Sequence, residues 1–391
     1  MKEFFTTEKQ LRLNIKKTVF LIMVLLIVLI VGIIILVYVL NENFREWADT
    51  KILFKEIEQG KTVSIEIQGE NIQATAFDQY IVVLQEKTLK FYNNLGVNVG
   101  NISVDINNAM FKTAGKYLVV AEKNGNKVYV ITGKTIYWET ETDGEITQIE
   151  VNDSGYIGIV TSDISYKNIV YLFSNNGSQL LKTYLANTKV ISISISKNNQ
   201  YLAIAEIDMS GVIIQSNIKI VSVEKAKSNP QDSIITTFKA DVGKLIVNIQ
   251  YQNKDRLICM YNDTIDMLEE GKSTTLVDLQ QNKITYSSIE LNNALTYIEE
   301  KPTGEHTSNS YVWILNPAHK TTKKYVAEKV AKEIYSYENV IGLNFGGELY
   351  VINKNGWLIK KYIANQEINS VIMSNKIVGI VYRDKIEIMD I

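Results

Sequence analysis

The chain of 391 residues contains one cysteine, two histidines and three prolines. Because Cys259 has no second cysteine to pair with, no internal disulfide can form, and the fold must be held together by packing alone. The net charge of −2 provides no excess of cations to displace counterions from phosphates. Nucleic acid is therefore not expected as a partner.

Charge is also lacking from one long stretch near the N-terminus, TVFLIMVLLIVLIVGIIILVYVL, which runs from Thr18 to Leu40. As a helix this stretch would measure about 34 Å, enough to cross the ~30 Å hydrocarbon core of a bilayer. A cleaved signal peptide has a shorter apolar region and a cleavage site with small residues, and no such site follows Leu40. We predict an uncleaved transmembrane helix that makes the membrane itself a partner.

The flanks of this stretch differ in charge. The basic residues before it are Lys2, Lys9, Arg12, Lys16 and Lys17, and those soon after it are Arg45, Lys51 and Lys55. Because positive charge is retained in the cytoplasm, residues 1–17 are predicted to be a cytoplasmic tail and the C-terminal part to be extracellular. The bias is five against three, so the reversed topology remains an alternative. Residues 41–61 are predicted to be a juxtamembrane stalk.

Beyond Gly60, short runs rich in Val, Ile and Tyr alternate with Asn, Gly, Asp and Lys, which is typical of strands and turns. Eight pairs of such runs repeat, for example QYIVVL with TLKFYN and NKIVGI with KIEIMD. The aligned residues of the eight pairs are Tyr80, Tyr117, Tyr156, Tyr201, Leu257, Leu295, Val340 and Ile377. Most intervals between them are close to the 40–45 residues of a four-stranded propeller blade. The longest interval contains Asn229-Pro230 and predicts a loop insertion.

Each pair is preceded by a further candidate strand, such as ITQIEV from Ile146, and most are followed by another, such as LIKKYI from Leu358. Four strands per unit predict an all-β fold, an eight-bladed β-propeller over residues 62–391, with seven blades as the alternative. Two β-sandwich domains would give a similar list of strands. The pairs Asn124-Gly125, Asn176-Gly177 and Asn355-Gly356 are expected to supply the positive φ angles of tight turns.

The last unit has no outer strand of its own, because the chain ends at Ile391 directly after the eighth pair. An unassigned strand, TVSIEI from Thr62 to Ile67, precedes the first unit. Pairing the two would close the ring and remove an exposed edge. We predict that the N-terminal strand completes the final blade.

On these repeats, the region from Thr62 to Ile391 resembles the WD40-like and quinoprotein-like β-propellers, and the whole chain resembles membrane-anchored bacterial propeller proteins of uncharacterised function. The resemblance rests on repeat spacing, because the Gly-His and Trp-Asp dipeptides of WD40 blades are absent. The quinoprotein family implies a vicinal cysteine pair, stacked tryptophans and calcium ligands, and this chain has one cysteine. Trp138, Trp313 and Trp357 are therefore expected to pack between blades, with a ligand platform as the alternative.

No residues fit a catalytic, cofactor or metal site. His306 and His319 lie in polar stretches without an accompanying ligand array, and Cys259 lies inside an apolar strand, which favours a buried thiol. Gly342 to Gly347 lie between two strands without a following helix, so they do not predict a phosphate loop. The acidic stretches Asp143-Gly144-Glu145, Asn152-Asp153-Ser154 and Asn262-Asp263 lack calcium-ligand spacing and are expected to be turns.

The sequence therefore favours a non-enzymatic module that binds or scaffolds a protein or a cell-envelope polymer. The alternative is a propeller enzyme, either glycan-active or an oxidoreductase, which would place converging carboxylates in the central channel or on one loop face. A third possibility is a structural or sensory part of an envelope complex. A basic run follows one hairpin and is expected to be a solvated outer strand and loop, with an anionic-surface contact as the alternative; its members are Lys320, Lys323, Lys324, Lys329 and Lys332.

Overall fold

The computed structural model describes residues 15–40, 44, 47–48, 52, 60–67, 72–253, 255–279, 284–305 and 307–391. The chain forms two compact units, Met1–Ile57 and Glu58–Ile391. Most of the predicted tail (1–17) and of the predicted stalk (41–61) lies outside the described residues.

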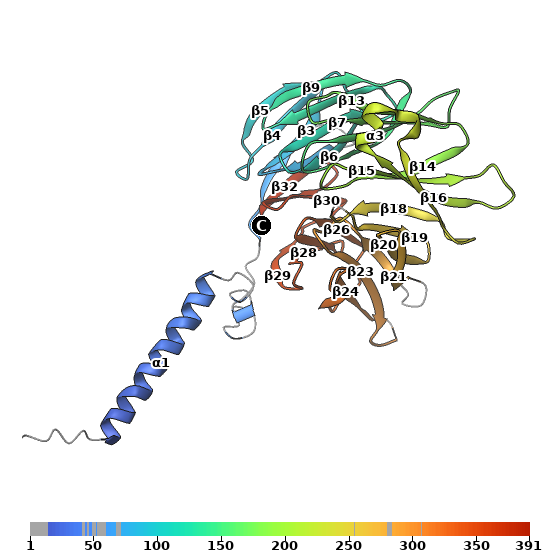
Figure 1. Ribbon diagram of the computed structural model, residues 1–391. Helices are drawn as coiled ribbons and strands as arrows, with labels where there is room; N and C mark the ends of the chain where they lie inside the picture. Colours follow the sequence, from blue (N-terminus) through green and yellow to red (C-terminus); the bar gives the residue numbers. More distant parts are fainter. Residues whose placement is uncertain are drawn as a thin grey trace, which may run out of the picture. The chain divides into compact units, whose positions relative to one another are not determined.

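The described part of the first unit is dominated by helix α1, Ile15–Leu40 (Figure 1). Its segment Val19–Leu40 has a mean hydropathy of 3.7, and none of it is buried within the protein. At 1.5 Å per residue, these 22 residues extend over about 33 Å. The helix is therefore long and apolar enough to cross a membrane, in agreement with the stretch predicted from Thr18 to Leu40.

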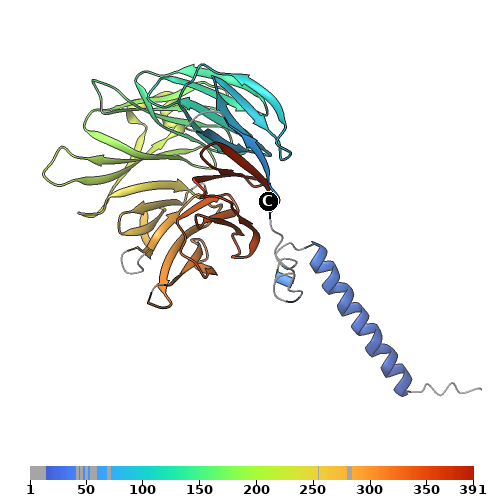
Figure 2. The same ribbon diagram turned by 180° about the vertical axis from the view of Figure 1, so that it is seen from behind.

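The second unit is a ring of eight four-stranded antiparallel blades, as the sequence predicts (Figures 1 and 2). Seven blades take four consecutive strands each, with the first strand of each blade innermost. The strands of blades 1 to 4 are β2 Gln73–Phe77, β3 Tyr80–Gln85, β4 Thr88–Tyr92, β5 Asn98–Ser103, β6 Ala109–Ala114, β7 Tyr117–Glu122, β8 Lys127–Thr132, β9 Thr135–Glu141, β10 Glu145–Val151, β11 Ile157–Ser162, β12 Asn168–Phe173, β13 Gln179–Leu185, β14 Thr188–Ile195, β15 Tyr201–Asp208, β16 Gln215–Ser222 and β17 Ile234–Lys239.

Blades 5 to 8 follow the same plan, except that the last blade takes its outer strand from the start of the unit. Their strands are β18 Ile246–Tyr251, β19 Leu257–Tyr261, β20 Thr264–Glu269, β21 Lys272–Asp278, β22 Ile284–Ser288, β23 Leu295–Pro302, β24 Ser308–Asn316, β25 Thr321–Ala327, β26 Glu333–Tyr337, β27 Val340–Asn344, β28 Glu348–Asn353, β29 Leu358–Ile363, β30 Ser370–Met373, β31 Ile377–Val381, β32 Lys385–Asp390 and β1 Val63–Glu66. All eight predicted hairpins are present as the two middle strands of a blade.

Ring closure occurs between β1 and β32, which confirms the predicted pairing of the chain's two ends. The strands are antiparallel, with Val63 opposite Ile388 and Ile65 opposite Ile386. Ile65 is buried in an apolar cluster that joins blade 8 to Ile81 of blade 1. In Figure 1 the blue first strand and the dark red last strands lie side by side accordingly.

Every junction between neighbouring blades contains one cluster of buried apolar side chains. The middle strands can be apolar on both faces because each face meets a neighbouring blade; β11 and β31, for example, are buried throughout or nearly so. At Gly158 the approach is so close that a Cβ would lie 2.6 Å from Ile193 Cδ1 of the next blade. Packing between blades is thus the main source of the ring's stability.

The long interval around Asn229-Pro230 differs from the predicted loop. It contains a short helix, α3 Val223–Ser228, and the 3-10 helix η1 Pro230–Asp232. The Ser222 Oγ accepts a hydrogen bond from the Lys225 backbone N–H, which caps α3. Val223 and Ala226 are buried against the apolar cluster between blades 3 and 4, so the insertion is held by packing.

The tight turns use positive φ angles as expected. Asn124 has a φ of 59°, Gly177 of 84° and Gly356 of 79°, so each predicted Asn-Gly pair places one residue in the left-handed region.

Strand β1 provides the first testable prediction. Replacing the buried Ile65 by alanine should lower the free energy of unfolding of the propeller by about 2–5 kcal/mol, because it leaves a cavity at the closure. The exposed neighbour Ser64→Ala should change it by less than about 0.5 kcal/mol. Urea unfolding followed by circular dichroism measures both, and equal effects of the two variants would contradict closure by β1.

Candidate functional site

A cavity of about 490 Å³ lies in the centre of the ring, and we call it the channel cavity. The innermost strand of every blade contributes to its wall. These contributions come mainly from the last residues of each strand, such as Lys112 in β6 and Glu150 in β10, and from the turns that follow. The channel cavity therefore lies toward the face at which the innermost strands end.

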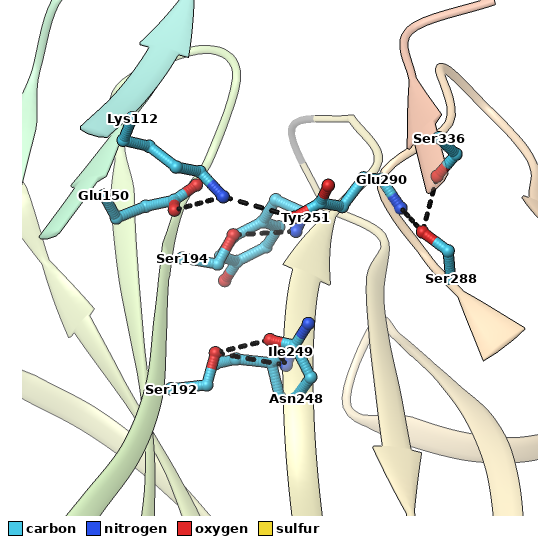
Figure 3. A network of polar contacts seen from close by, with 10 residues as sticks. All are labelled: Lys112, Glu150, Ser192, Ser194, Asn248, Ile249, Tyr251, Ser288, Glu290 and Ser336. Carbon is cyan, nitrogen blue, oxygen red and sulfur yellow. Dashed lines mark hydrogen bonds and ion pairs between the residues drawn. The ribbon is translucent and has the colours of Figure 1, made fainter. Parts of the chain in front are cut away.

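An ion network crosses the channel cavity (Figure 3). The Lys112 Nζ lies 3.3 Å from Glu150 Oε2 in the adjacent blade and 3.3 Å from Glu290 Oε1 in blade 6. Blades 2 and 6 are four positions apart in a ring of eight, so the lysine links opposite sides of the ring. The Glu150 side chain is only 11% exposed, whereas Glu290 is 47% exposed.

Burial and the neighbouring charges shift the pKa values of Glu150 and Lys112 in opposite directions. Burial raises the pKa of Glu150, and the nearby Lys112 ammonium lowers it only in part. The pKa of Lys112 is raised, chiefly by the Glu150 carboxylate and against the effect of burial. Lys112 therefore remains protonated, acting as a fixed positive charge between two carboxyl groups.

Serine side chains also join neighbouring innermost strands of the ring (Figure 3). The Ser192 Oγ in β14 donates to Asn248 Oδ1 in β18 at 2.7 Å, and the Tyr251 backbone N–H donates to Ser194 Oγ at 2.9 Å. Ser288 and Ser336 form a comparable contact between β22 and β26. These polar groups satisfy one another and fix the positions of the strands.

The turns at the rim are also linked. The Lys197 Nζ donates to Asn292 Oδ1 at 2.8 Å, and the Asn292 backbone N–H donates to the Glu338 carbonyl at 2.6 Å. The charged side chains in the wall are two lysines and four acids: Lys112, Lys197, Glu150, Asp153, Glu290 and Glu338. The channel cavity is thus acidic overall and polar. It suits hydrogen-bond donors and cations better than anions.

The carboxyl groups that the enzyme hypothesis placed in the central channel are therefore present. Glu150 and Glu290 converge there, but on a lysine. General acid–base catalysis requires a group that exchanges a proton with the substrate, and Lys112 now stands between the two acids. As it stands, the arrangement consists of ion pairs that connect opposite sides of the ring.

The residues considered from the sequence lie elsewhere. Cys259 is buried in β19, and burial raises the pKa of its thiol, so it is not a reactive nucleophile. His319 is exposed in the turn after β24, and His306 lies outside the described residues. Within the described ranges, no group of three or more His, Cys, Asp or Glu side chains is close enough to hold a metal ion.

The acidic stretches act as turns, as predicted. The Asn152 Oδ1 accepts hydrogen bonds from the backbone N–H groups of Ser154 and Tyr156. The Asn262 Oδ1 accepts one from the Leu245 N–H at 2.8 Å, and Asp143 pairs with Lys182.

The glycine-rich stretch from Gly342 to Gly347 forms the end of a strand and a turn. Gly342 lies in β27, and Gly346 N–H donates to Asn344 Oδ1 at 2.7 Å in the turn that follows.

The tryptophans behave differently from one another. Trp138 contacts Phe173 of the next blade, with ring centroids 5.8 Å apart, as predicted for packing between blades. Trp313 instead stacks on Tyr297 of its own blade and donates from Nε1 to Glu299 at 3.0 Å. Trp357 lies half-buried in the turn between β28 and β29.

The basic run forms the outer strand β25 and the turns beside it, as predicted. Two of its lysines pair with acids, Lys329 with Glu348 and Lys332 with Glu367.

Sequence reasoning missed Lys112, Glu150 and Glu290. A charged residue inside an otherwise apolar or neutral strand, as in AMFKTA and ITQIEV, was the available signal. It identifies an innermost strand but not the partner across the ring.

The ion network provides a second prediction. In Lys112→Met, Glu150 loses its compensating charge, and we expect a loss of about 1–3 kcal/mol in the free energy of unfolding. A raised pKa in the folded state means that folding favours the protonated Glu150, so its contribution to stability falls as the pH rises through that pKa. The loss should therefore be larger at about pH 8 than at about pH 5. Urea unfolding at the two pH values tests this, with the exposed Lys123→Met as control; a loss independent of pH would contradict it.

Several solved β-propellers are similar to this chain in fold. An oligogalacturonate lyase in complex with manganese is 9% identical at a TM-score of 0.53, covering 85% of this chain and 97% of that chain. Chaetomium thermophilum Sqt1, bound to the N-terminus of ribosomal protein L10, is 13% identical at a TM-score of 0.53, covering 85% and 100%. The oligogalacturonate lyase of Vibrio parahaemolyticus is 9% identical at a TM-score of 0.51, covering 85% and 98%. At such identities the similarity shows the fold alone.

Comparison with curated proteins gives no match. A family model described as "Family of unknown function (DUF5711)" matches residues 49–391, which include the whole propeller. The chain therefore belongs to the DUF5711 family of unknown function.

Proposed function

We propose that this protein is a membrane-anchored, non-enzymatic propeller that binds a protein or a cell-envelope partner. The observation that carries the proposal is the combination, in one chain, of an apolar helix long enough to span a membrane and a ring with a buried apolar cluster at each of its eight junctions. A ring that is stable without a ligand holds its surface loops in fixed positions, which favours recognition by those loops.

The proposed anchor is α1 itself, uncleaved, with the N-terminus in the cytoplasm and the propeller outside. The charge bias across the apolar stretch supports this orientation. No small-residue cleavage site follows Leu40, which supports retention of the helix.

The proposed contact surface is formed by two hairpin tips of blades 3 and 4, which we call the hairpin-tip patch. It consists of Ile164 between β11 and β12 and of Met209, Val212, Ile213 and Ile214 between β15 and β16. Ile164 and Val212 are fully exposed, at 106% and 105%. Turns between second and third strands lie on the same face in neighbouring blades, so the two tips are neighbours. Clustered apolar side chains at such tips favour a binding surface over a solvated loop.

A crosslinking experiment tests the hairpin-tip patch. A photoreactive residue placed at Ile164 or at Val212 of the full-length protein in cells should give a discrete crosslinked product. The same residue at Leu95, which is 67% exposed in a turn of blade 1 on the opposite face, should give none. Equal crosslinking from all three positions, or none from the patch, would contradict the proposed surface.

The single buried cysteine allows a direct test of sidedness. Because Cys259 is buried and the pKa of its thiol is raised, the unmodified protein should react little with maleimides. In intact cells, a membrane-impermeant maleimide should label Val212→Cys and leave Lys9→Cys unlabelled until the cells are permeabilised. The opposite pattern would establish the reversed topology, and loss of residue 9 from the purified protein would establish cleavage.

A second candidate function is a glycan-active enzyme, favoured by the convergence of Glu150 and Glu290 in the channel cavity. It predicts that purified full-length protein shortens an anionic or neutral polysaccharide and that Glu150→Gln abolishes this. Chain length is measured by size-exclusion chromatography. Activity retained in Glu150→Gln would exclude Glu150 as its source.

A further inference from the structure

A second cavity, of about 500 Å³, lies between blades 4 and 5 and is separate from the hairpin-tip patch. We call it the inter-blade cleft. Its wall is mainly apolar and aromatic, and it includes Tyr201, Ile220, Phe238, Tyr251, Leu257 and Leu268. Ile220, Tyr251, Leu257 and Leu268 are themselves almost fully buried, so these side chains have fixed positions. The volume and the apolar lining match those of sites for small organic molecules.

The local sequence explains why this junction is not filled. The outer strand of blade 4, β17, reads IITTFK, and the short side chain of Thr236 faces the cleft where a large residue would close it. On the other side, Gly271 in the turn between β20 and β21 has a φ of 77°, and a Cβ built there would meet nothing within 4 Å. Small residues on both sides thus leave an opening at the surface.

Acidic side chains lie at the opening. Among the described residues, the charged side chains that line the inter-blade cleft are Asp255 and Glu270, both exposed. The nearby Arg256 guanidinium is held 2.7 Å from Glu269 Oε1 and does not line the cleft.

A smaller cavity of about 160 Å³ lies on the other side of Phe238 and Leu268, which line both spaces. Its wall contains Asp266, which is 5% exposed and whose Oδ1 has no hydrogen-bond partner in the described part of the chain. The other oxygen, Oδ2, lies 3.1 Å from Lys244 Nζ. The junction of blades 4 and 5 therefore contains both a buried oxygen without a hydrogen bond and apolar space that no side chain fills.

We propose that the inter-blade cleft binds a small molecule with an apolar or aromatic body and a cationic end. The body packs among Phe238, Leu257 and Leu268, and the cation lies at the opening beside Glu270. This binding activity is independent of the proposed partner surface, because it uses the junction of blades 4 and 5 and not the hairpin tips.

Three matched probes test the ligand class: 4-phenylbutylamine, 4-phenylbutanol and 4-phenylbutyrate share one body and differ in charge. Binding to full-length protein in lipid nanodiscs is followed by saturation-transfer NMR and titration, with empty nanodiscs subtracted. The amine should bind with the lowest Kd, at least tenfold below that of the carboxylate. Equal affinities, or no saturable binding of the amine, would overturn the proposal.

Matched variants locate the site. Thr236→Trp fills the inter-blade cleft and should abolish binding of the amine, whereas Thr237→Trp, on the exposed face of the same strand, should leave it unchanged. Glu270→Gln, at an exposed position, should weaken the amine several-fold and leave 4-phenylbutanol unaffected. Binding that survives in Thr236→Trp would overturn the assignment, and so would an unchanged preference in Glu270→Gln. Crosslinking from the hairpin-tip patch should remain in all three variants, so the outcomes of the two proposals can be distinguished.

Discussion

Packing of each blade on the next is the interaction on which the rest of the propeller depends. With its single thiol buried and unpaired, the chain gains its stability mainly from apolar area removed from water at eight junctions. A linear stack of the same sheets would leave two apolar faces exposed, whereas a ring leaves none. Closure through β1 therefore matters beyond its four residues, because it fixes blade 8 between the apolar cluster that it shares with blade 7 and the one that it shares with blade 1.

The close packing of neighbouring blades also explains why glycine occurs at certain positions in the middle strands. Where two blades approach closely, the middle strand carries glycine: Gly158 faces Ile193, Gly342 faces Met373, and Gly379 faces Ile81. All three lie two residues after the aligned position of their repeat, at Tyr156, Val340 and Ile377. A Cβ at any of them would come within about 3.0 Å of the neighbouring blade's side chain. In these three blades, glycine is therefore a packing requirement of the ring and not a sign of a flexible turn.

Much of this architecture could be predicted from the sequence because its signals are local. Alternating apolar residues, turn pairs such as Asn176-Gly177 and the spare strand from Thr62 gave the blades and their closure. Features that depend on distant partners could not be predicted. The Lys112–Glu290 contact joins residues 178 positions apart across the ring, and α3 is too short for helical periodicity to appear. The inter-blade cleft results from small residues on two different blades, Thr236 and Gly271, which no single segment reveals.

The distribution of polar groups then separates structure from recognition. In the channel cavity, Lys112 is paired with two acids, and Ser288 and Ser336 bind each other, so these groups are largely satisfied within the protein. A ligand entering there would have to replace existing contacts, which lowers the net gain on binding. The hairpin-tip patch and the inter-blade cleft differ, because Val212 and the walls beside Phe238 leave apolar area uncovered that a partner or ligand can bury. Since the ring is already stable without either contact, binding at these two surfaces is not needed to offset the cost of folding, and its free energy is available for affinity.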